Sequence, residues 1–339
     1  MAILPLASGA TAWQARCVSA QTTRPVRNKE TTGPVRRASL VAWICLLIVY
    51  LVWGSTYLAI RVGVETMPPL MMAAARQLVA GLIMFPLAIR SRRAAVRAGR
   101  IERLWPSRAE WLGCAIVGIL LLVANGVVGV GEKTVPSGLA ALLVATVPLW
   151  LLGIDAGLNH ARIGLAPLAG LLLGLAGVAL LSGLGGDSHG TSVTGVLIIL
   201  GAAAAWALGT IMAGRVTIPS SAALASGMEL LAGGAALLVL SATTGEFSSV
   251  HLSAVSARSW LALGYLIVFG SIVAFSAYGI AVRDLPTATV ATYAYVNPVI
   301  AVLLGALILN ERLTPATIAG GVLIVGAVFL VVRRRPPAH

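Results

Sequence analysis

The sequence predicts an all-α integral membrane protein with ten transmembrane helices, arranged as two inverted five-helix repeats, with both termini in the cytoplasm. Three observations support this fold class. The 339 residues are 58% hydrophobic and only 10% charged, with a mean hydropathy of +0.95, whereas soluble domains carry about a quarter charged residues. Ten apolar segments are each long enough to cross a bilayer. The second half of the chain also repeats the first.

The chain begins with a polar segment and then continues in apolar spans. Residues 1–39 are basic and contain no apolar run long enough for a signal-peptide core, so we expect a disordered cytoplasmic tail. A spanning helix needs about 20 mostly apolar residues, because each residue adds only about 1.5 Å of rise. The ten segments interpreted as spans are Leu40–Ile60, Pro68–Ile89, Trp111–Val130, Ser137–Ile154, Ile163–Leu184, Val193–Ala213, Ser221–Thr243, Trp260–Val282, Thr287–Leu309 and Pro315–Val332. A short cytoplasmic tail, 334–339, follows.

The basic residues give these spans an orientation. Nineteen of the 24 Lys and Arg residues fall on one alternating set of loops and tails, seven of them between Arg90 and Arg108. The four on the opposite side are Arg61, Lys133, Arg258 and Arg312. Because cytoplasmic loops are enriched in Lys and Arg, both termini are predicted to be cytoplasmic. The net charge of +13 therefore reflects membrane orientation, and no nucleic-acid partner is expected.

An internal repeat connects the two halves. Pro136 and Pro148 recur as Pro286 and Pro298, both at an offset of 150. Other matches have offsets between 149 and 154. Glu110-Trp111-Leu112 matches Ser259-Trp260-Leu261, and Gln77-Leu78-Val79-Ala80-Gly81 matches Glu229-Leu230-Leu231-Ala232-Gly233. Trp53, Thr56 and Arg61 match Trp206, Thr210 and Arg215. The predicted repeats are 40–184 and 193–333. Because five spans is an odd number, the second copy is inverted, as in transporters that hold substrate near the midplane between repeats.

Several short motifs, in order along residues 40–333, resemble the EamA-type family of the drug/metabolite transporter (DMT) superfamily. They are Trp53-Gly54-Ser55-Thr56, Arg76, Pro136-Ser137-Gly138, Tyr295-Val296-Asn297-Pro298 and Asn310-Glu311-Arg312-Leu313-Thr314. The first half departs from the last motif, because it reads Asn159-His160-Ala161-Arg162. The resemblance implies secondary transport, commonly export of amino acids, other metabolites or drugs, without a bound cofactor.

Two ionisable residues lie deep in predicted spans. Arg76 is eight residues into its span and Glu229 eight residues into another, so each lies roughly 12 Å from the end of its own span. A charge at the bilayer centre costs about 2.5 to 3.5 kcal/mol on insertion scales. Arg76 is a candidate to bind an anionic group of the substrate, and Glu229 to take up a proton or a cationic group. The alternatives for both are a structural ion pair or separate partners on neighbouring helices.

Polar residues in other spans complete the candidate substrate site. Thr289, Tyr293 and Asn297 recur at i, i+4 and i+8, so a continuous helix would place them on one face, and Pro298 leaves the carbonyl of Ala294 without its helical partner. Asn125 and Tyr278 are further candidates for a cavity, against interhelical hydrogen bonding. Trp53 is also a candidate, although belt anchoring at the membrane surface is the favoured alternative for this residue.

Other classes of protein fit the sequence less well. An intramembrane enzyme acting on lipid or peptide is the main alternative, but no span contains a histidine for a Ser/His protease, and Glu229 is the only carboxylate deep in a span. A channel or scaffold does not explain the repeat, and phosphate-sugar exchangers would need more basic residues than Arg76 alone. No metal-site spacing is present. We expect a multi-pass exporter of small metabolites or drugs in the bacterial inner membrane, not an enzyme. Its substrate, its coupling to protons and its assembly into a homo-oligomer stay open.

Overall fold

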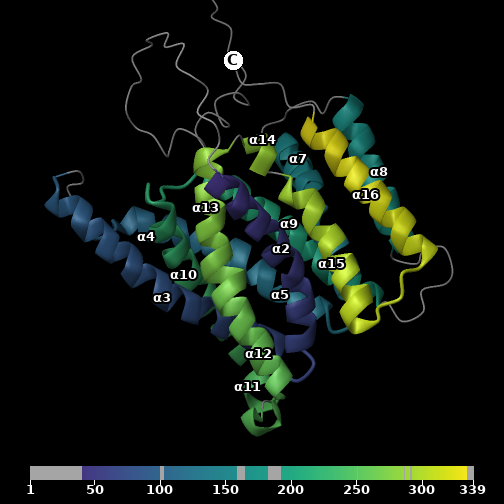
Figure 1. The fold of residues 1–339 in the computed structure, drawn as a ribbon, viewed down its shortest axis with the longest axis horizontal. Coiled ribbons are helices and arrows are strands. Elements are labelled where there is room, and N and C mark those ends of the chain that lie inside the picture. The colour runs from purple at the N-terminus through teal and green to yellow at the C-terminus, as the bar shows by residue number, and fades with distance from the viewer. Residues whose placement is uncertain are drawn as a thin grey trace, which may run out of the picture.

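The computed structural model describes residues 40–99, 103–158, 165–181, 192–249, 251–285, 287–290 and 292–333. Within these ranges the chain forms helices and no strand, as predicted, and the helices stand together in one bundle (Figure 1). The first half contains α2 (Leu40–Gly63), α3 (Pro69–Arg97), α4 (Arg108–Gly118), η1 (Ile119–Val123), α5 (Ala124–Gly131), α6 (Ser137–Val144), α7 (Val147–Leu158) and α8 (Leu165–Leu181). The second half contains α9 (Val193–Ala213), α10 (Ala222–Thr243), α11 (Glu246–Ser249), η2 (Leu252–Ala254), α12 (Ala257–Tyr265), η3 (Leu266–Val273), α13 (Ala274–Asp284), α14 (Thr287–Val290), α15 (Tyr293–Leu309) and α16 (Pro315–Arg333).

The lengths and surfaces of these helices suit a bilayer. Seven helical segments are long and apolar enough to cross a membrane: Leu40–Gly63, Pro69–Arg97, Arg108–Gly131, Ser137–Leu158, Val193–Ala213, Ala222–Thr243 and Ala257–Tyr278. Three shorter apolar helices are Leu168–Leu180, Val296–Leu309 and Pro315–Ala327. Large apolar side chains point outward from the bundle, including Leu82, Leu197 and Leu307 at 64%, 62% and 78% exposure. Such an apolar exterior would be a liability in water and is favourable in lipid.

Two predicted spans are interrupted, and in the ninth the break lies before Tyr293 and not at Pro298, where the sequence indicates a disturbed helix. The fourth span divides into α6 and α7, and the hydroxyl of Thr146 donates to the carbonyl of Leu143 at the junction (2.6 Å). The ninth span divides into α14 and α15, whereas Pro298 lies inside α15. Proline has no N–H to donate within a helix, and it disfavours the helical conformation of the residue before it. Both interruptions lie upstream of the paired prolines, Pro148 and Pro298.

Two π-helical segments also depart from the predicted regular helices. η1 lies between α4 and α5, and η3 lies between α12 and α13. Both π-helical segments follow the matched tryptophans, Trp111 and Trp260, so they fall at corresponding positions of the two halves. π-helices are rare and concentrate at functional sites. Hydrophobic periodicity does not reveal them, because one extra residue in a turn leaves the apolar composition of the span unchanged.

Corresponding helices of the two halves pack against each other in antiparallel pairs. Gly81, Gly227 and Gly234 face Leu231, Phe85 and Leu78, so α3 and α10 run in opposite directions. In the same way Gly174 faces Ala327 and Gly177 faces Gly320 and Ile324, which makes α8 and α16 antiparallel. These two helices lie side by side at one edge of the bundle (Figure 1). The small residues allow the helix backbones to approach closely.

Some expectations fall outside the described residues. They concern the tails at 1–39 and 334–339, the Asn159–Arg162 segment and the loop after residue 184. The basic segment after the second span is partly helical, because α3 continues to Arg97 instead of ending near Ile89. α3 therefore carries Arg90, Arg92 and Arg93 beyond its apolar portion.

Candidate functional site

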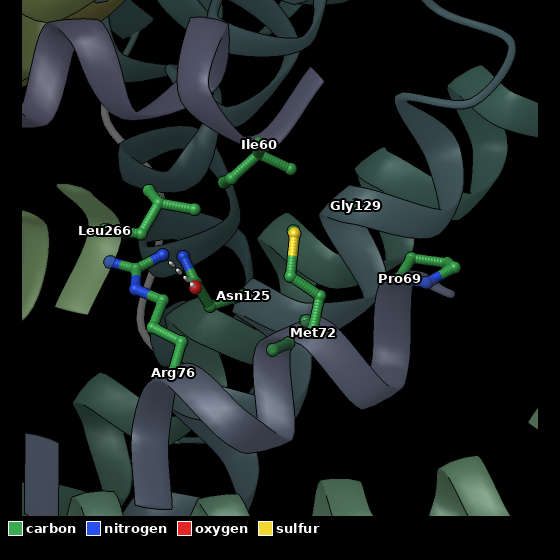
Figure 2. A pocket seen from close by; sticks show the side chains of 9 residues that line it. Ile60, Pro69, Met72, Arg76, Asn125, Gly129 and Leu266 are labelled. Atoms are coloured by element: carbon green, nitrogen blue, oxygen red, sulfur yellow. Dashed lines mark hydrogen bonds between the residues drawn. The ribbon is translucent and has the colours of Figure 1, made fainter. Parts of the chain in front are cut away.

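Arg76 lies inside the bundle, where it meets only neutral groups. Its side chain is 6% exposed. The guanidinium Nε donates to Ser271 Oγ at 3.1 Å and Nη1 donates to Asn125 Oδ1 at 3.2 Å; Figure 2 shows the contact with Asn125. Among the described residues Arg76 forms no ion pair. The structural ion pair considered as one alternative for Arg76 is therefore not formed in this conformation, whereas its partners on neighbouring helices correspond to the other alternative.

Three helices position this guanidinium. Arg76 is on α3, Asn125 on α5 and Ser271 in η3, so both halves of the chain contribute. Gly270 also belongs to η3, and a Cβ atom there would lie 3.3 Å from Arg76 Nη2, tighter than an ordinary contact. Gln77 Nε2 donates to the same Asn125 oxygen at 3.4 Å, and its own Oε1 is buried without a hydrogen-bond partner among the described residues. The site thus combines a cation with an unused acceptor.

The cavity beside Arg76 is small. It has a volume of about 10 Å³, which is close to the minimum for one water molecule. Its lining residues are Ile60, Pro69, Met72, Ala73, Arg76, Asn125, Gly126, Gly129 and Leu266, most of which are labelled in Figure 2. An amino acid does not fit in this space. Binding such a molecule here requires α3, α5 and η3 to separate.

Three aromatic side chains pack around Trp53, close to the segment that contacts Arg76. Its ring lies 5.5 Å from Phe275, 5.2 Å from Tyr278 and 5.3 Å from Tyr293, measured between ring centroids. The indole N–H donates to the carbonyl of Gly270 at 3.3 Å, next to the residue that accepts from Arg76. Trp53 is therefore packed between helices of the two halves. The sequence places these rings on three predicted spans, with Phe275 and Tyr278 on the same one, and does not predict their contact with Trp53.

The predicted stripe of Thr289, Tyr293 and Asn297 is not a single helix face. Thr289 belongs to α14 and the other two to α15. The carbonyl of Thr289 accepts from the Thr292 hydroxyl, which also contacts the Tyr50 hydroxyl. Asn297 is 8% exposed, and its Oδ1 has no hydrogen-bond partner among the described residues. The Tyr293 ring contacts the ring of Trp53. The main-chain carbonyl oxygen of Asn297 lies close to Gly54 of α2.

Glu229 is separate from the Arg76 network. α3 and α10 pair so that Gly227 faces Phe85 and Gly234 faces Leu78. This register places Glu229 level with Ile83, which follows Arg76 by seven positions on α3. At 1.5 Å per residue this is about 10 Å along the helices. The main chain of Glu229 contacts Gly118, and its side chain is half-buried.

Two carboxylates in the turns were not predicted as candidates. Glu132, between α5 and α6, has an exposed fraction of 0% and both of its Oε atoms lack a partner among the described residues. Glu311, between α15 and α16, accepts from Ser137 N (2.7 Å), Ser137 Oγ (2.9 Å) and Gly138 N (3.1 Å) at the start of α6. The signal available in the sequence for Glu132 was the shortness of the five-residue turn that contains it, between two long apolar segments.

Comparison with known proteins places the chain in a transporter family. The EamA-like transporter family matches residues 40–183 and 193–333. "Uncharacterized inner membrane transporter YedA" of Escherichia coli (strain K12) is 40% identical over 84% of this chain and 89% of the relative. "Probable amino-acid metabolite efflux pump" of the same organism is 27% identical over 85% and 93%. "Probable terminal-alkyne amino-acid exporter" of Streptantibioticus cattleyicolor is 27% identical over 88% and 95%.

The fold also matches a protein solved by crystallography, with a TM-score of 0.54, 23% identity, and coverage of 85% of this chain and 95% of that one. The names of the family and of the relatives indicate transporters and not enzymes. The two family matches together span nearly all of the chain from residue 40 onward, and they agree with its many apolar helices. The chain is therefore a multi-pass inner-membrane protein that belongs to the EamA-like transporter family.

Proposed function

We propose that this chain is a secondary active transporter that exports small metabolites, such as amino acids or related compounds, or drugs, by alternating access. The single observation that carries the proposal is Arg76. A guanidinium inside a bilayer protein is costly, and here its partners are the neutral Ser271 and Asn125. A substrate carboxylate would supply the missing negative charge through a charge-assisted pair. The cluster around Trp53 would contact the remainder of the substrate.

The proposed architecture has ten spans in two inverted repeats, 40–184 and 193–333, with both termini in the cytoplasm. The seven long apolar helices and three shorter ones support ten crossings. The antiparallel pairing of α3 with α10 and of α8 with α16 supports inversion, because helices related by a two-fold axis in the membrane plane run in opposite directions. The asymmetry of Lys and Arg supports the orientation.

The mechanism follows from the position of Arg76 between the halves. In this conformation Arg76, Asn125 and Ser271 hold α3, α5 and η3 together around a cavity of about 10 Å³. A carboxylate that binds the guanidinium replaces these neutral partners. The helices can then exchange one set of contacts for another without leaving the cation unpaired. This would let the site open to either side of the membrane, as alternating access requires.

The experiment that tests this function is transport by the full chain in proteoliposomes, with amino acids and cationic drugs screened with and without a pH gradient. We expect at least one compound carrying a carboxylate to cross faster than in empty liposomes. Competition by other carboxylates should slow it, whereas the corresponding amides should not compete. If only compounds without an anionic group are transported, the role proposed for Arg76 is wrong. If no compound is transported, the proposed function fails.

A further inference from the structure

Glu132 is a buried carboxyl that the proposed substrate site does not use. It follows the last residue of α5, and Ser137 begins α6 five residues later. Its exposed fraction is 0%, and neither Oε atom has a hydrogen-bond partner among the described residues. A charged carboxylate without partners is very costly to bury, so such a group becomes neutral instead. In this conformation burial therefore favours the neutral carboxylic acid form of the Glu132 side chain.

The charged and titratable groups that face Glu132 come from two other elements. Arg61 and Tyr57 lie on α2, and Glu311 precedes α16, while α9 contributes the apolar Ile199 beside the preceding Gly131. Burial raises the pKa of the Glu132 carboxyl well above its usual range; Arg61 opposes this rise and Glu311 adds to it. Burial is the largest of these effects, so it decides the direction.

Neither neighbouring charge is free to neutralise a Glu132 carboxylate here. The Arg61 Nη1 donates to the main-chain carbonyl of Glu132 and not to its carboxyl group. The Glu311 carboxylate is already occupied by Ser137 and Gly138 at the start of α6. These contacts tie α2, the α5–α6 turn and the α15–α16 turn into one closed end of the bundle. In the proposed topology this end faces the outside.

We propose that Glu132 is a proton-binding site that controls the opening of this end of the bundle. The proposal rests on the proposed alternating-access function. When α2 moves away from the α5–α6 turn, water reaches the carboxyl, its O–H bond breaks, and the proton leaves to water. The resulting carboxylate is then solvated and can pair with Arg61. Binding a proton from the outside reverses these steps and closes the end. After release of its substrate, an exporter would in this way return to the conformation that faces the cytoplasm.

The sign of the pH effect follows from linkage. The pKa of Glu132 is higher when this end is closed than when it is open to water, because burial favours the neutral form. The closed form is therefore favoured fully below the open-state pKa, and the preference is lost as pH rises through the closed-state pKa. Acid closes this end and alkali opens it.

Accessibility of a buried cysteine tests this without knowledge of the substrate. Met72 lines the cavity beside Arg76 and is 3% exposed. Met72→Cys is introduced into the full chain after Cys17, Cys45 and Cys114 are replaced by Ser. It is labelled from outside with a membrane-impermeant maleimide at a series of pH values. The rate is divided by that of Ser253→Cys, an exposed position on η2, which removes the pH dependence of the maleimide reaction itself.

We expect the normalised labelling rate to rise with pH in the parent protein. In Glu132→Gln, which imitates the protonated acid, the rate should stay at its low acid value at every pH. Glu132→Asp keeps a titratable carboxyl and should retain the rise, as should the control Glu65→Gln, which removes an exposed carboxylate. A rise that persists in Glu132→Gln overturns the proposal, as does a parent protein with no rise. Because labelling needs no substrate, a negative transport screen leaves this result readable.

Discussion

At the scale of single residues, the chain places ionisable groups where their partners are incomplete. Arg76 has neutral partners, and the Oε1 atom of the adjacent Gln77 is buried without a hydrogen-bond partner in the part of the chain that the structure describes. A fully paired guanidinium would favour one static arrangement, since breaking a buried charged pair is expensive. A guanidinium with neutral partners costs less to release. The position therefore suits a ligand that binds and leaves.

The first prediction concerns Arg76. Arg76→Ala should abolish transport of carboxylate substrates. Arg76→Lys should lower the transport rate by roughly 10- to 100-fold, because a charged hydrogen bond contributes about 1.5–3 kcal/mol and the compact ammonium of lysine lacks the planar fork of donors with which Arg76 reaches Ser271 and Asn125. Initial rates in proteoliposomes, at equal protein content, measure the effect. Arg258→Ala is the matched control, because that side chain is 57% exposed. Rates of Arg76→Ala equal to the parent would remove Arg76 from the site.

The second prediction concerns Glu229, whose side chain is half-buried and about 10 Å along the helices from Arg76. We expect Glu229→Gln to slow substrates that carry an additional cationic group by about tenfold, the cost of losing roughly 1.4 kcal/mol of interaction. Neutral zwitterions should be transported as before. Competition between a cationic and a neutral substrate in the same vesicles measures this ratio. An unchanged ratio would mean that Glu229 does not contact the substrate.

At the scale of elements, close helix packing depends on a few glycines. A Cβ atom at Gly118 would overlap the main chain of Glu229, because α4 and α10 touch there. By contrast, no atom lies within 4 Å of a Cβ built at Gly264 of α12. Both residues are helical and both substitutions replace hydrogen by methyl. The two positions therefore separate the effect of packing from that of helix propensity.

The third prediction uses this pair. Gly118→Ala should lower the free energy of unfolding by about 1–3 kcal/mol, the usual cost of overpacking, and should reduce the thermal midpoint of the purified protein. Gly264→Ala should leave it unchanged or raise it slightly, because alanine restricts the unfolded chain. Equal midpoints for the two variants would contradict the close approach of α4 and α10.

The elements also show what the sequence could and could not predict. Apolar length located the helices, and it correctly indicated a membrane chain whose regular structure, over the described residues, is helical. It could not locate η1 or η3, since a π-helical turn does not alter composition, nor the interruption before Pro298. At the site, the sequence indicated Arg76, Asn125 and Trp53 individually. Their grouping depends on contacts between residues about 50 to more than 200 positions apart, which helical periodicity does not encode.

At the scale of the whole molecule, orientation is the property that the charge pattern predicts most directly. Our fourth prediction is that Arg97→Cys, at the end of α3, is protected from an impermeant maleimide added outside the cell, whereas Glu65→Cys, between α2 and α3, is labelled. Both side chains are exposed, so the expected difference comes from the side of the membrane. Permeabilised cells, in which both positions should react, provide the control. The reverse pattern in intact cells would invert the topology.

The matching π-helices bear on the history of the chain. A π-helical turn holds one residue more than the α-helical turn it replaces, as an insertion would produce, and that extra residue rotates everything beyond it by about 100°. η1 and η3 follow the paired Trp111 and Trp260 at similar distances. An insertion shared by both copies is most simply dated to before the gene duplication. The ancestral five-helix unit then already carried the bulge, and one copy inserted upside down beside another would have brought two such bulges into a single bundle.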